Sequence, residues 1–247
     1  WAMGQKMITI FLHIPKTGGT TLNSVFQKQF VSNELFDHDR FQNKIMTIED
    51  LKEREKEQLK GVSGHYFYGV HEYFSKPCQY FTMLRDPIER VISSYYFLQT
   101  YPIYPQVRDM TLDEFVKQMP FAQNLQTKMV SGVRRNPNLQ KALENLRVFK
   151  VTGITEQFDE SLFLMKREFG WKNIFYTKKN VTKTRKSRSE IPPETIRLIK
   201  EYNKLDIKLY HFGKQLLAEM LIEFTEQEKQ ELDAFKKEQH KQIQKGQ

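Results

Sequence analysis

The sequence of 247 residues contains a single cysteine, Cys78, which excludes an intramolecular disulfide and any zinc site built from several cysteines. No apolar stretch approaches the roughly 18 residues that a membrane-spanning helix needs, and no secretory signal peptide is recognisable. The first four residues, Trp-Ala-Met-Gly, resemble residues left by an expression vector, so an N-terminal segment could have been removed. These features predict a cytoplasmic protein, and a bacterial source is compatible with them.

The chain also lacks internal repeats and an excess of acidic residues. Its 39 Lys and Arg residues outnumber 30 Asp and Glu residues, which gives a formal net charge of +9 and an isoelectric point near 9.4. Such a charge favours an anionic partner, for which nucleic acid, an anionic glycan and a polyphosphate nucleotide all qualify. A hydrophobic content of 39% is typical of a folded chain, and the length suits one α/β domain or at most two small domains.

The stretch Met7 to Phe30, MITIFLHIPKTGGTTLNSVFQKQF, organises the rest of the chain. An apolar run at 7–12 predicts a buried strand, and apolar residues at three- and four-residue steps from Leu22 onward predict a helix. The turn between them contains two glycines, three threonines and Lys16. Backbone N–H groups at a helix N-terminus, together with a lysine, predict an anion site. A Walker A loop is a poor match, because there the lysine follows the second glycine.

The string His-Ile-Pro-Lys-Thr-Gly-Gly-Thr-Thr resembles the 5′-phosphosulfate loop of sulfotransferases that use 3′-phosphoadenosine 5′-phosphosulfate (PAPS), particularly the heparan sulfate 2-O and 6-O branch. The resemblance implies an α/β fold, with a P-loop-type parallel sheet flanked by helices in a single sulfotransferase domain. It implies that Lys16 stabilises the leaving group, adenosine 3′,5′-bisphosphate (PAP). The implied donor-binding residues of this loop are Pro15, Lys16, Thr17, Gly18, Gly19, Thr20 and Thr21.

A second motif, R-D-P-I-E-R-V-I-S-S-Y-Y, follows an apolar run at 79–84 that predicts another core strand. Pro87 suits the first turn of a helix. An ordinary strand–helix corner, with Asp86 as N-cap and Arg85 in a surface salt bridge, is one explanation of the motif. Arg85 and Ser93 would face an anion at the carboxyl end of this strand, where open α/β sheets bind ligands. The motif resembles the family's 3′-phosphate site, which implies that Arg85 and Ser93 hold that phosphate.

Two histidines are candidates for the general base that removes the proton of the acceptor hydroxyl. Gly64-His65 resembles the 2-O branch, whereas Tyr68-Gly69-Val70-His71 resembles the 6-O branch. A histidine suits this role because its pKa lies near neutral pH. The sequence favours His71 narrowly over His65.

Two further segments supply candidate residues by resemblance to the same family. Asn124, Gln126 and Thr127 would face the acceptor, although a helix with one polar face explains them equally well. The basic run 178–188 would close over the nucleotide, with Thr184, Arg185 and Lys186 near the 3′-phosphate, although a solvated basic loop is the default for such a run.

The remaining pattern predicts strands at 148–154 and 174–177, and loops at 31–43 and 61–74. A charged helix is expected at 47–60. The predicted organisation is an N-terminal extension or expression scar (1–6), a sulfotransferase domain (7–224) and a charged C-terminal helix or tail (225–247).

The predicted function is transfer of a sulfuryl group from PAPS, without a metal, to a hydroxyl of a carbohydrate-type acceptor. Partners would be the donor nucleotide and a glycan, with nucleic acid disfavoured. The Golgi lumen replaces the cytoplasm as the expected location if an anchor was removed. Two alternatives stay open: a P-loop nucleotide kinase-like enzyme, and a non-catalytic module that binds anionic glycans or nucleic acid.

Overall fold

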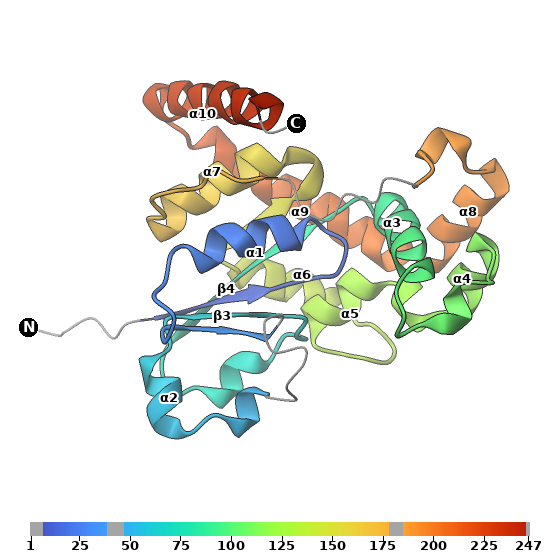
Figure 1. Ribbon diagram of the computed structural model, residues 1–247, viewed down its shortest axis with the longest axis horizontal. Helices are drawn as coiled ribbons and strands as arrows, with labels where there is room; N and C mark the ends of the chain where they lie inside the picture. Colours follow the sequence, from blue (N-terminus) through green and yellow to red (C-terminus); the bar gives the residue numbers. More distant parts are fainter. Residues whose placement is uncertain (1–6, 39–46, 178–184, 246–247) are drawn as a thin grey trace, which may run out of the picture.

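The computed structural model describes residues 7–38, 47–177 and 185–245 of the chain. Its centre is a five-stranded parallel sheet in the order β2-β3-β1-β4-β5. The strands are β1 (Ile8–Leu12), β2 (Leu35–Asp37), β3 (Gly61–Gly64), β4 (Cys78–Leu84) and β5 (Val151–Ile154). Parallel strands need crossover connections and cover on both faces, and helices flank this sheet (Figure 1). The predicted α/β class is confirmed.

The α-helices connect the strands and extend beyond the sheet. They are α1 (Gly19–Gln27), α2 (Glu53–Gln58), α3 (Pro87–Gln99), α4 (Leu112–Gln118), α5 (Leu125–Ser131), α6 (Leu139–Val148), α7 (Phe158–Phe169), α8 (Pro193–Tyr202), α9 (Lys204–Ile222) and α10 (Glu226–Lys245). Short 3-10 turns lie at Ile48–Asp50, Val70–Tyr73, Pro105–Val107, Pro120–Ala122, Thr155–Gln157 and Arg188–Glu190. None of the helices within the described ranges is long and apolar enough to cross a membrane.

The main core lies at the sheet, where β1 is buried at every position because it is the central strand. Phe11, Phe26 and Phe81 stack there, with ring centroids 4.8 to 6.3 Å apart. A second hydrophobic cluster joins α3, α4 and α8 beside the sheet (Figure 1). Phe115 and Ile199 are fully buried in this cluster. The packing of α4 and α8 against α3 therefore fixes α3 at the carboxyl end of β4.

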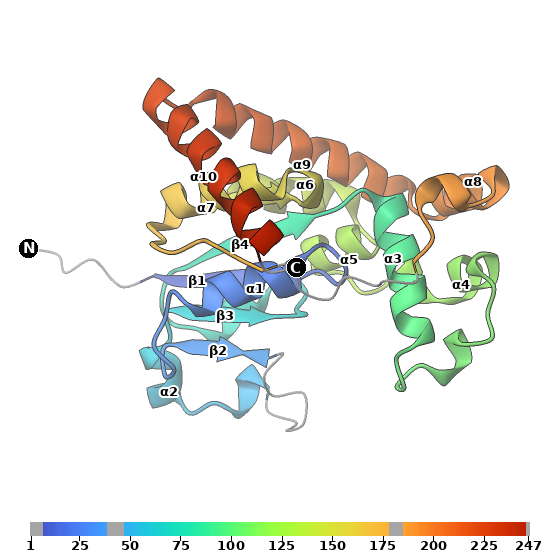
Figure 2. The ribbon, with the colours of Figure 1, turned by 45° about the horizontal axis from the view of Figure 1, so that its top comes forward.

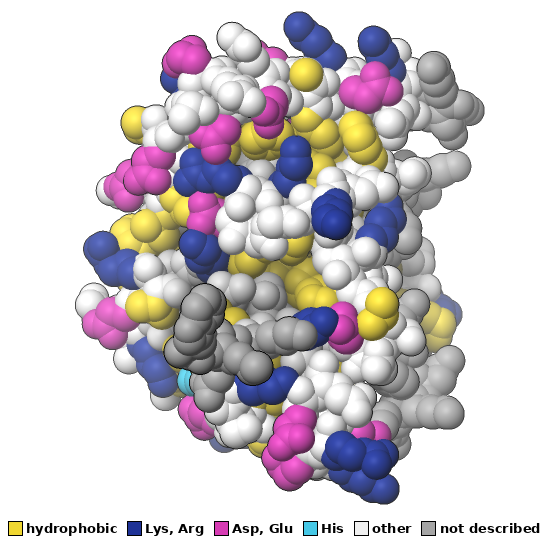
Figure 3. Space-filling view, turned by 90° about the vertical axis from the view of Figure 1, so that its left-hand side faces the viewer, with side chains coloured by type: hydrophobic (Ala, Val, Ile, Leu, Met, Phe, Trp, Pro, Cys, Tyr) yellow, Lys and Arg dark blue, Asp and Glu magenta, His cyan; other side chains and the backbone are white. Residues whose placement is uncertain are grey.

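The C-terminal helix α10 lies across α7, and its C-terminal end turns back toward the middle of the molecule (Figure 2). Phe235 of α10 packs against Phe163 of α7 and against Phe175, with centroids 6.2 and 5.5 Å away. Hydrophobic side chains gather in the furrow below this helix (Figure 3). The helix is thus fastened to the domain through one face.

Four predictions about elements are corrected. The expected loops at 31–43 and 61–74 contain β2 and β3, and the expected helix at 47–60 is a 3-10 turn followed by α2. The segment 174–177 is not a strand, because the backbone N–H and C=O of Tyr176 bond to the side-chain amide of Gln239 and not to a neighbouring strand.

Candidate active site

Four strands each end at a residue that lines one large pocket. His13, His65, Arg85 and Thr155 follow β1, β3, β4 and β5 directly. Parallel strands place their carboxyl ends at the same sheet edge, which is where open α/β sheets bind ligands. The pocket has a volume of about 1300 Å³. Because small-molecule sites occupy roughly 300–1,000 Å³, this pocket has room for two substrates.

The loop between β1 and α1 forms the floor of this pocket. Gly18 is the N-cap of α1 and has a left-handed φ of 78°, and Lys16 also has a positive φ, of 68°. A lysine rarely adopts this conformation, and such strain persists where surrounding contacts impose it. Thr155 Oγ1 supplies one contact by donating to the carbonyl of Thr17 at 2.6 Å. The carbonyl of Lys16 accepts a bond from Arg85 Nη1 at 3.0 Å.

The two glycines of the loop have different roles. A Cβ on Gly19 would overlap the ring of His13, so no side chain fits there without a shift. A Cβ on Gly18 would lie 3.4 Å from the ring of Phe158, but its positive φ disfavours other residues. Both glycines line the pocket, so the backbone at the start of α1 borders it, as the backbone of an anion site does.

Three cationic side chains converge above this floor: Lys16, Arg85 and Arg185. Burial, reinforced by the charges of Arg85 and Arg185, lowers the pKa of Lys16 to about 8. Burial, with the charge of Arg185, also lowers the pKa of Arg85. Lys16 Nζ lies 3.8 Å above the centroid of the Phe97 ring. The cations repel one another, so the pocket favours an anion.

Two nitrogens of this cluster indicate what the pocket can hold. Arg85 Nε and Arg185 Nε are buried and have no hydrogen-bond partner in the described part of the chain. Buried polar groups are normally bonded, and an unsatisfied one calls for a missing ligand or water. Glu89 pairs with Arg185 and lies 3.8 Å from Arg85, so one carboxylate faces two guanidinium groups. The residues fit a nucleotide with several phosphate-type groups.

Helix α3 contributes hydroxyl groups to the same wall. Asp86 caps the helix by accepting bonds from the N–H groups of Ile88 and Glu89, as predicted. Ser93 is buried, lines the pocket and makes no side-chain hydrogen bond within the described ranges. Its neighbour Ser94 also lines the pocket. Arg85 and Ser93, predicted as one site from the second motif, are thus brought together.

The structure separates the two candidate bases. His65 lines the pocket, and its ring packs on that of His13 at 4.3 Å between centroids. His65 Nδ1 lies 2.7 Å from the carbonyl oxygen of His13. A carbonyl only accepts, so Nδ1 carries the proton of the neutral ring and Nε2 is its basic nitrogen. His71 does not line the pocket, and its Nδ1 lies 2.9 Å from the hydroxyl of Tyr80. The arrangement thus favours His65, and the choice between the two histidines stays a prediction.

Asn124, Gln126 and Thr127 lie behind the pocket wall and not in its lining. Gln126 is fully buried, and its side chain bonds both the N–H and the C=O of Arg85 at 2.9 Å. Thr127 bonds the buried carboxylate of Asp206, and the Asn124 side chain caps the start of α9. Their polar groups are used within the fold, so direct contact with an acceptor is not favoured by this arrangement.

The other predicted residues are distributed as follows. Pro15, Thr20 and Thr21 line the pocket, whereas Thr17 is buried and donates to the carbonyl of Ile14 at 2.9 Å. Arg185 lines the pocket, but Lys186 is exposed outside it. Thr184 lies outside the described residues.

Several pocket residues have no signal in the sequence motifs. One end carries the apolar side chains Phe67, Phe97, Leu98, Tyr101, Tyr104, Phe121, Leu125 and Met129. The other end carries Phe158, Asp159, Glu160, Tyr176, Lys236 and His240. The aromatic pairs at 97/101 and 104/121 could be found only as a local excess of aromatics, and the α10 residues not at all.

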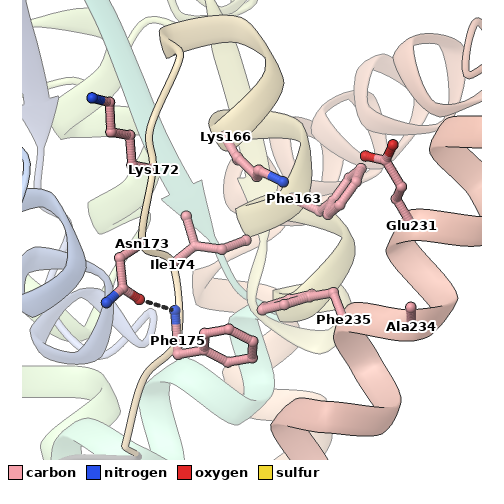
Figure 4. Close-up of a pocket in the computed structure, with 9 residues that line it drawn as sticks. All are labelled: Phe163, Lys166, Lys172, Asn173, Ile174, Phe175, Glu231, Ala234 and Phe235. Atoms are coloured by element: carbon pink, nitrogen blue, oxygen red, sulfur yellow. Dashed lines mark hydrogen bonds between the residues drawn. The ribbon is translucent and has the colours of Figure 1, made fainter.

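A second cavity of about 530 Å³ lies between α7, the segment 172–175 and α10 (Figure 4). Phe163, Phe175 and Phe235 face one another across it. Lys172 points away from α10, and Asn173 bonds the N–H of Phe175 at 3.2 Å. This cavity is a packing gap under α10, without converging polar groups.

Comparisons with known proteins give the family of the chain. The sulfotransferase family matches residues 5–213, so the chain belongs to the sulfotransferase family. Human heparan-sulfate 6-O-sulfotransferase 1 is 26% identical over 276 residues, covering 86% of this chain and 66% of the relative. Heparan-sulfate 6-O-sulfotransferase 2 of Gallus gallus is 25% identical over 303 residues, covering 96% of this chain and 73% of the relative. The chain spans about two thirds of the length of the human relative.

Among solved structures, mouse sulfotransferase SULT7A1 complexed with PAP aligns over 96% of this chain and 86% of that chain. Its TM-score is 0.39 and its sequence identity is 12%, which is too distant a similarity for a structural conclusion.

Proposed function

We propose that this chain transfers a sulfuryl group from PAPS to a hydroxyl group of a carbohydrate. The observation that carries the proposal is the convergence of Lys16, Arg85 and Arg185 beside the start of α1, where Arg85 Nε and Arg185 Nε are buried without a partner among the described residues. Membership of the sulfotransferase family supports the reaction class. The names of the heparan-sulfate relatives support a carbohydrate acceptor.

In this proposal each end of the donor meets its own group of residues. The first N–H groups of α1 and Lys16 bind the 5′-phosphosulfate end. Arg85, Ser93 and Arg185 bind the 3′-phosphate, and they discriminate against nucleotides that lack it. Charge-assisted bonds of this kind are stronger than neutral ones, and the buried setting increases their contribution.

The transfer itself is an in-line displacement at sulfur. The acceptor oxygen forms the new S–O bond while the bond between sulfur and the bridging oxygen of the phosphosulfate breaks. Lys16 stabilises the negative charge that develops on that bridging oxygen. His65 Nε2 takes the proton of the attacking hydroxyl, and the bond from Nδ1 to the carbonyl of His13 holds the ring. Positioning and charge stabilisation supply most of the rate in such a scheme.

The aromatic end of the pocket lies beside these groups, since Lys16 Nζ stands over Phe97. Phe97 and Tyr101 stack at 5.2 Å, and Tyr104 and Phe121 lie 5.3 Å apart. Flat apolar side chains next to a few polar groups are typical of small-molecule sites, and they offer faces against which sugar rings pack. We assign the acceptor to this end.

A thermal-shift comparison of PAP, 5′-AMP and ATP with Mg²⁺ tests the donor assignment. A ligand that binds only the folded state raises the melting temperature by mass action. PAP should stabilise the protein well above AMP, and Arg85→Gln and Ser93→Ala should reduce that difference. A preference for ATP with Mg²⁺ would support a kinase-like enzyme, and no shift with any nucleotide would support a non-catalytic binding module.

A further inference from the structure

The C-terminal helix α10 contributes to the pocket although it lies beyond the segment that the family comparison matches, which ends at residue 213. Lys236 and His240 of α10 line the same pocket as the phosphate loop. The polar composition of this helix, taken alone, predicts a solvated tail. We infer that α10 completes the subsite for the base of the donor nucleotide, an inference that rests on the function proposed above.

The subsite lies next to the phosphate loop. The ring of Phe158 lies against Gly18, because a Cβ built on that glycine would meet it at 3.4 Å. Tyr176 packs on Phe158 edge to face, with centroids 4.9 Å apart, and donates its hydroxyl to Asp159 at 2.7 Å. All three side chains line the pocket. Aromatic side chains of this kind hold a nucleobase by stacking, and a base bound there leaves its phosphates beside Lys16.

Gln239 of α10 fixes Tyr176 in this place. Gln239 is fully buried, its Nε2 donates to the carbonyl of Tyr176 at 2.7 Å, and its Oε1 accepts from the N–H of Tyr176 at 3.2 Å. The amide thus replaces the neighbouring strand that the extended segment lacks. Gln239 does not line the pocket, so it acts through Tyr176 as a positioning residue.

Helix α10 is itself held in register along this segment. Phe235 packs on Phe163 and Phe175 (Figure 4). Lys236 forms an ion pair with Glu160 of α7. Lys236 is one turn from His240 on the pocket side, and His240 Nδ1 lies 3.3 Å from the carbonyl of Lys236. Both side chains line the pocket from α10, and in this proposal they lie beside the base.

The test compares a ligand with a base and one without. PAP and ribose 3′,5′-bisphosphate share both phosphates, and only PAP has the purine. In Gln239→Ala and His240→Ala, we expect PAP to bind about tenfold to a hundredfold more weakly, because a stacked base contributes binding on that scale. Ribose 3′,5′-bisphosphate should bind each variant as it binds the unmodified chain. Calorimetry on the full chain measures both affinities.

Gln227→Ala is the matched control, because Gln227 lies on α10 and its amide bonds only the exposed Glu231. Circular dichroism checks that α10 stays folded in Gln239→Ala, and His240→Ala changes only an exposed side chain. Equal weakening of both ligands would reveal a general structural effect and overturn the inference. Unchanged PAP binding in both variants would also overturn it. Failure of the unmodified chain to bind either ligand would instead contradict the proposed function.

Discussion

Lys16 combines a strained backbone with a side-chain pKa that is lowered mainly by burial, and Arg85 contributes to both. Its carbonyl is bound by Arg85 and its ammonium group is buried beside Arg85 and Arg185. The pKa falls from 10.5 to about 8. Between pH 8 and 10.5 the unfolded chain therefore binds more protons than the folded chain, so the contribution of Lys16 to the free energy of unfolding increases with pH there. Below pH 8 Lys16 is charged in both the folded and the unfolded chain, so its burial lowers the free energy of unfolding by the full amount that the pKa difference represents.

Binding of PAP should reverse this shift, because an anion favours the ammonium form. We predict that PAP binding takes up protons near pH 8.5 and that its affinity falls as pH rises above 8. Phosphate groups with a second pKa near 6 have finished titrating by then. Calorimetry in buffers of different ionisation enthalpy measures the uptake. Lys16→Arg should bind PAP without proton uptake, and an affinity independent of pH between 7 and 9.5 in the unmodified chain would contradict the prediction.

Substitution of His65 and substitution of His71 should have different effects on the rate of sulfuryl transfer. His65→Ala should lower kcat about 100-fold or more, since a general base contributes roughly 10² to 10⁴ in rate. His71→Ala should keep kcat within about twofold, because His71 contacts Tyr80 outside the pocket. Initial rates of sulfuryl transfer, with PAP affinity measured in parallel, separate catalysis from binding. A large loss in His71→Ala with normal turnover in His65→Ala would restore the preference that the sequence gave to His71.

At the scale of elements, Gln126 connects α5 to the end of β4. Its amide bonds both backbone groups of Arg85, and Asp206 at the start of α9 bonds the backbone of Gln126 and Thr127. The proposed 3′-phosphate site is therefore supported from behind by two helices. Residues that the sequence indicated as substrate contacts are explained here as supports of the site.

We predict that Gln126→Leu destabilises the protein by about 2–5 kcal/mol, because each buried backbone group of Arg85 left without a partner costs about 1–3 kcal/mol. Urea denaturation measures this loss. Gln126→Glu should also destabilise the protein, since its carboxylate accepts from the N–H of Arg85 but sets a second acceptor against the carbonyl of Arg85 in a buried site. Both variants should also weaken PAP binding, and equal stability of the Leu variant and the unmodified chain would rule out the supporting role.

Elements with a continuous apolar run could be predicted from the sequence, and those without one could not. β1 and β4 are such runs. Each is followed directly by one of the two motifs, so the sequence alone indicated both motifs as candidate phosphate sites. β3 is different, because Gly61 and Gly64 flank only two other residues. A Cβ on Gly61 would lie 2.8 Å from the Phe30 ring, so close packing requires glycine at this position. Because glycine is uncommon in strands, the sequence gives no strand signal there.

At the scale of the whole molecule, the pocket depends on residues far apart in sequence. Lys16 meets Phe97 and Arg85, and Gly18 meets Phe158. Two ion pairs join the segment 185–190 to α3: Arg185 pairs with Glu89, and Arg188 pairs with Asp86. Such contacts follow from the strand order and from helix docking, which no single motif specifies. The same holds for α10, whose composition gives no sign of the pocket that it lines.

The overall charge sets a last expectation. A chain of net charge +9 gathers three cations in one pocket, so the free protein should be stabilised by a divalent anion that enters it. We predict that sodium sulfate at low millimolar concentration raises the melting temperature more than sodium chloride at equal ionic strength. At tenfold over its dissociation constant, a ligand contributes about 1.4 kcal/mol to the free energy of unfolding.

Sulfate also stabilises proteins in general by exclusion from their surfaces, but that effect grows steadily with concentration and does not saturate. Arg185→Gln removes one of the three cations and should retain only this general effect. PAP should suppress the specific response of the unmodified chain, because both anions then compete for Arg85 and Lys16. Equal sulfate responses in the two proteins, or a response that PAP leaves unchanged, would mean that the cations do not act together as one anion site.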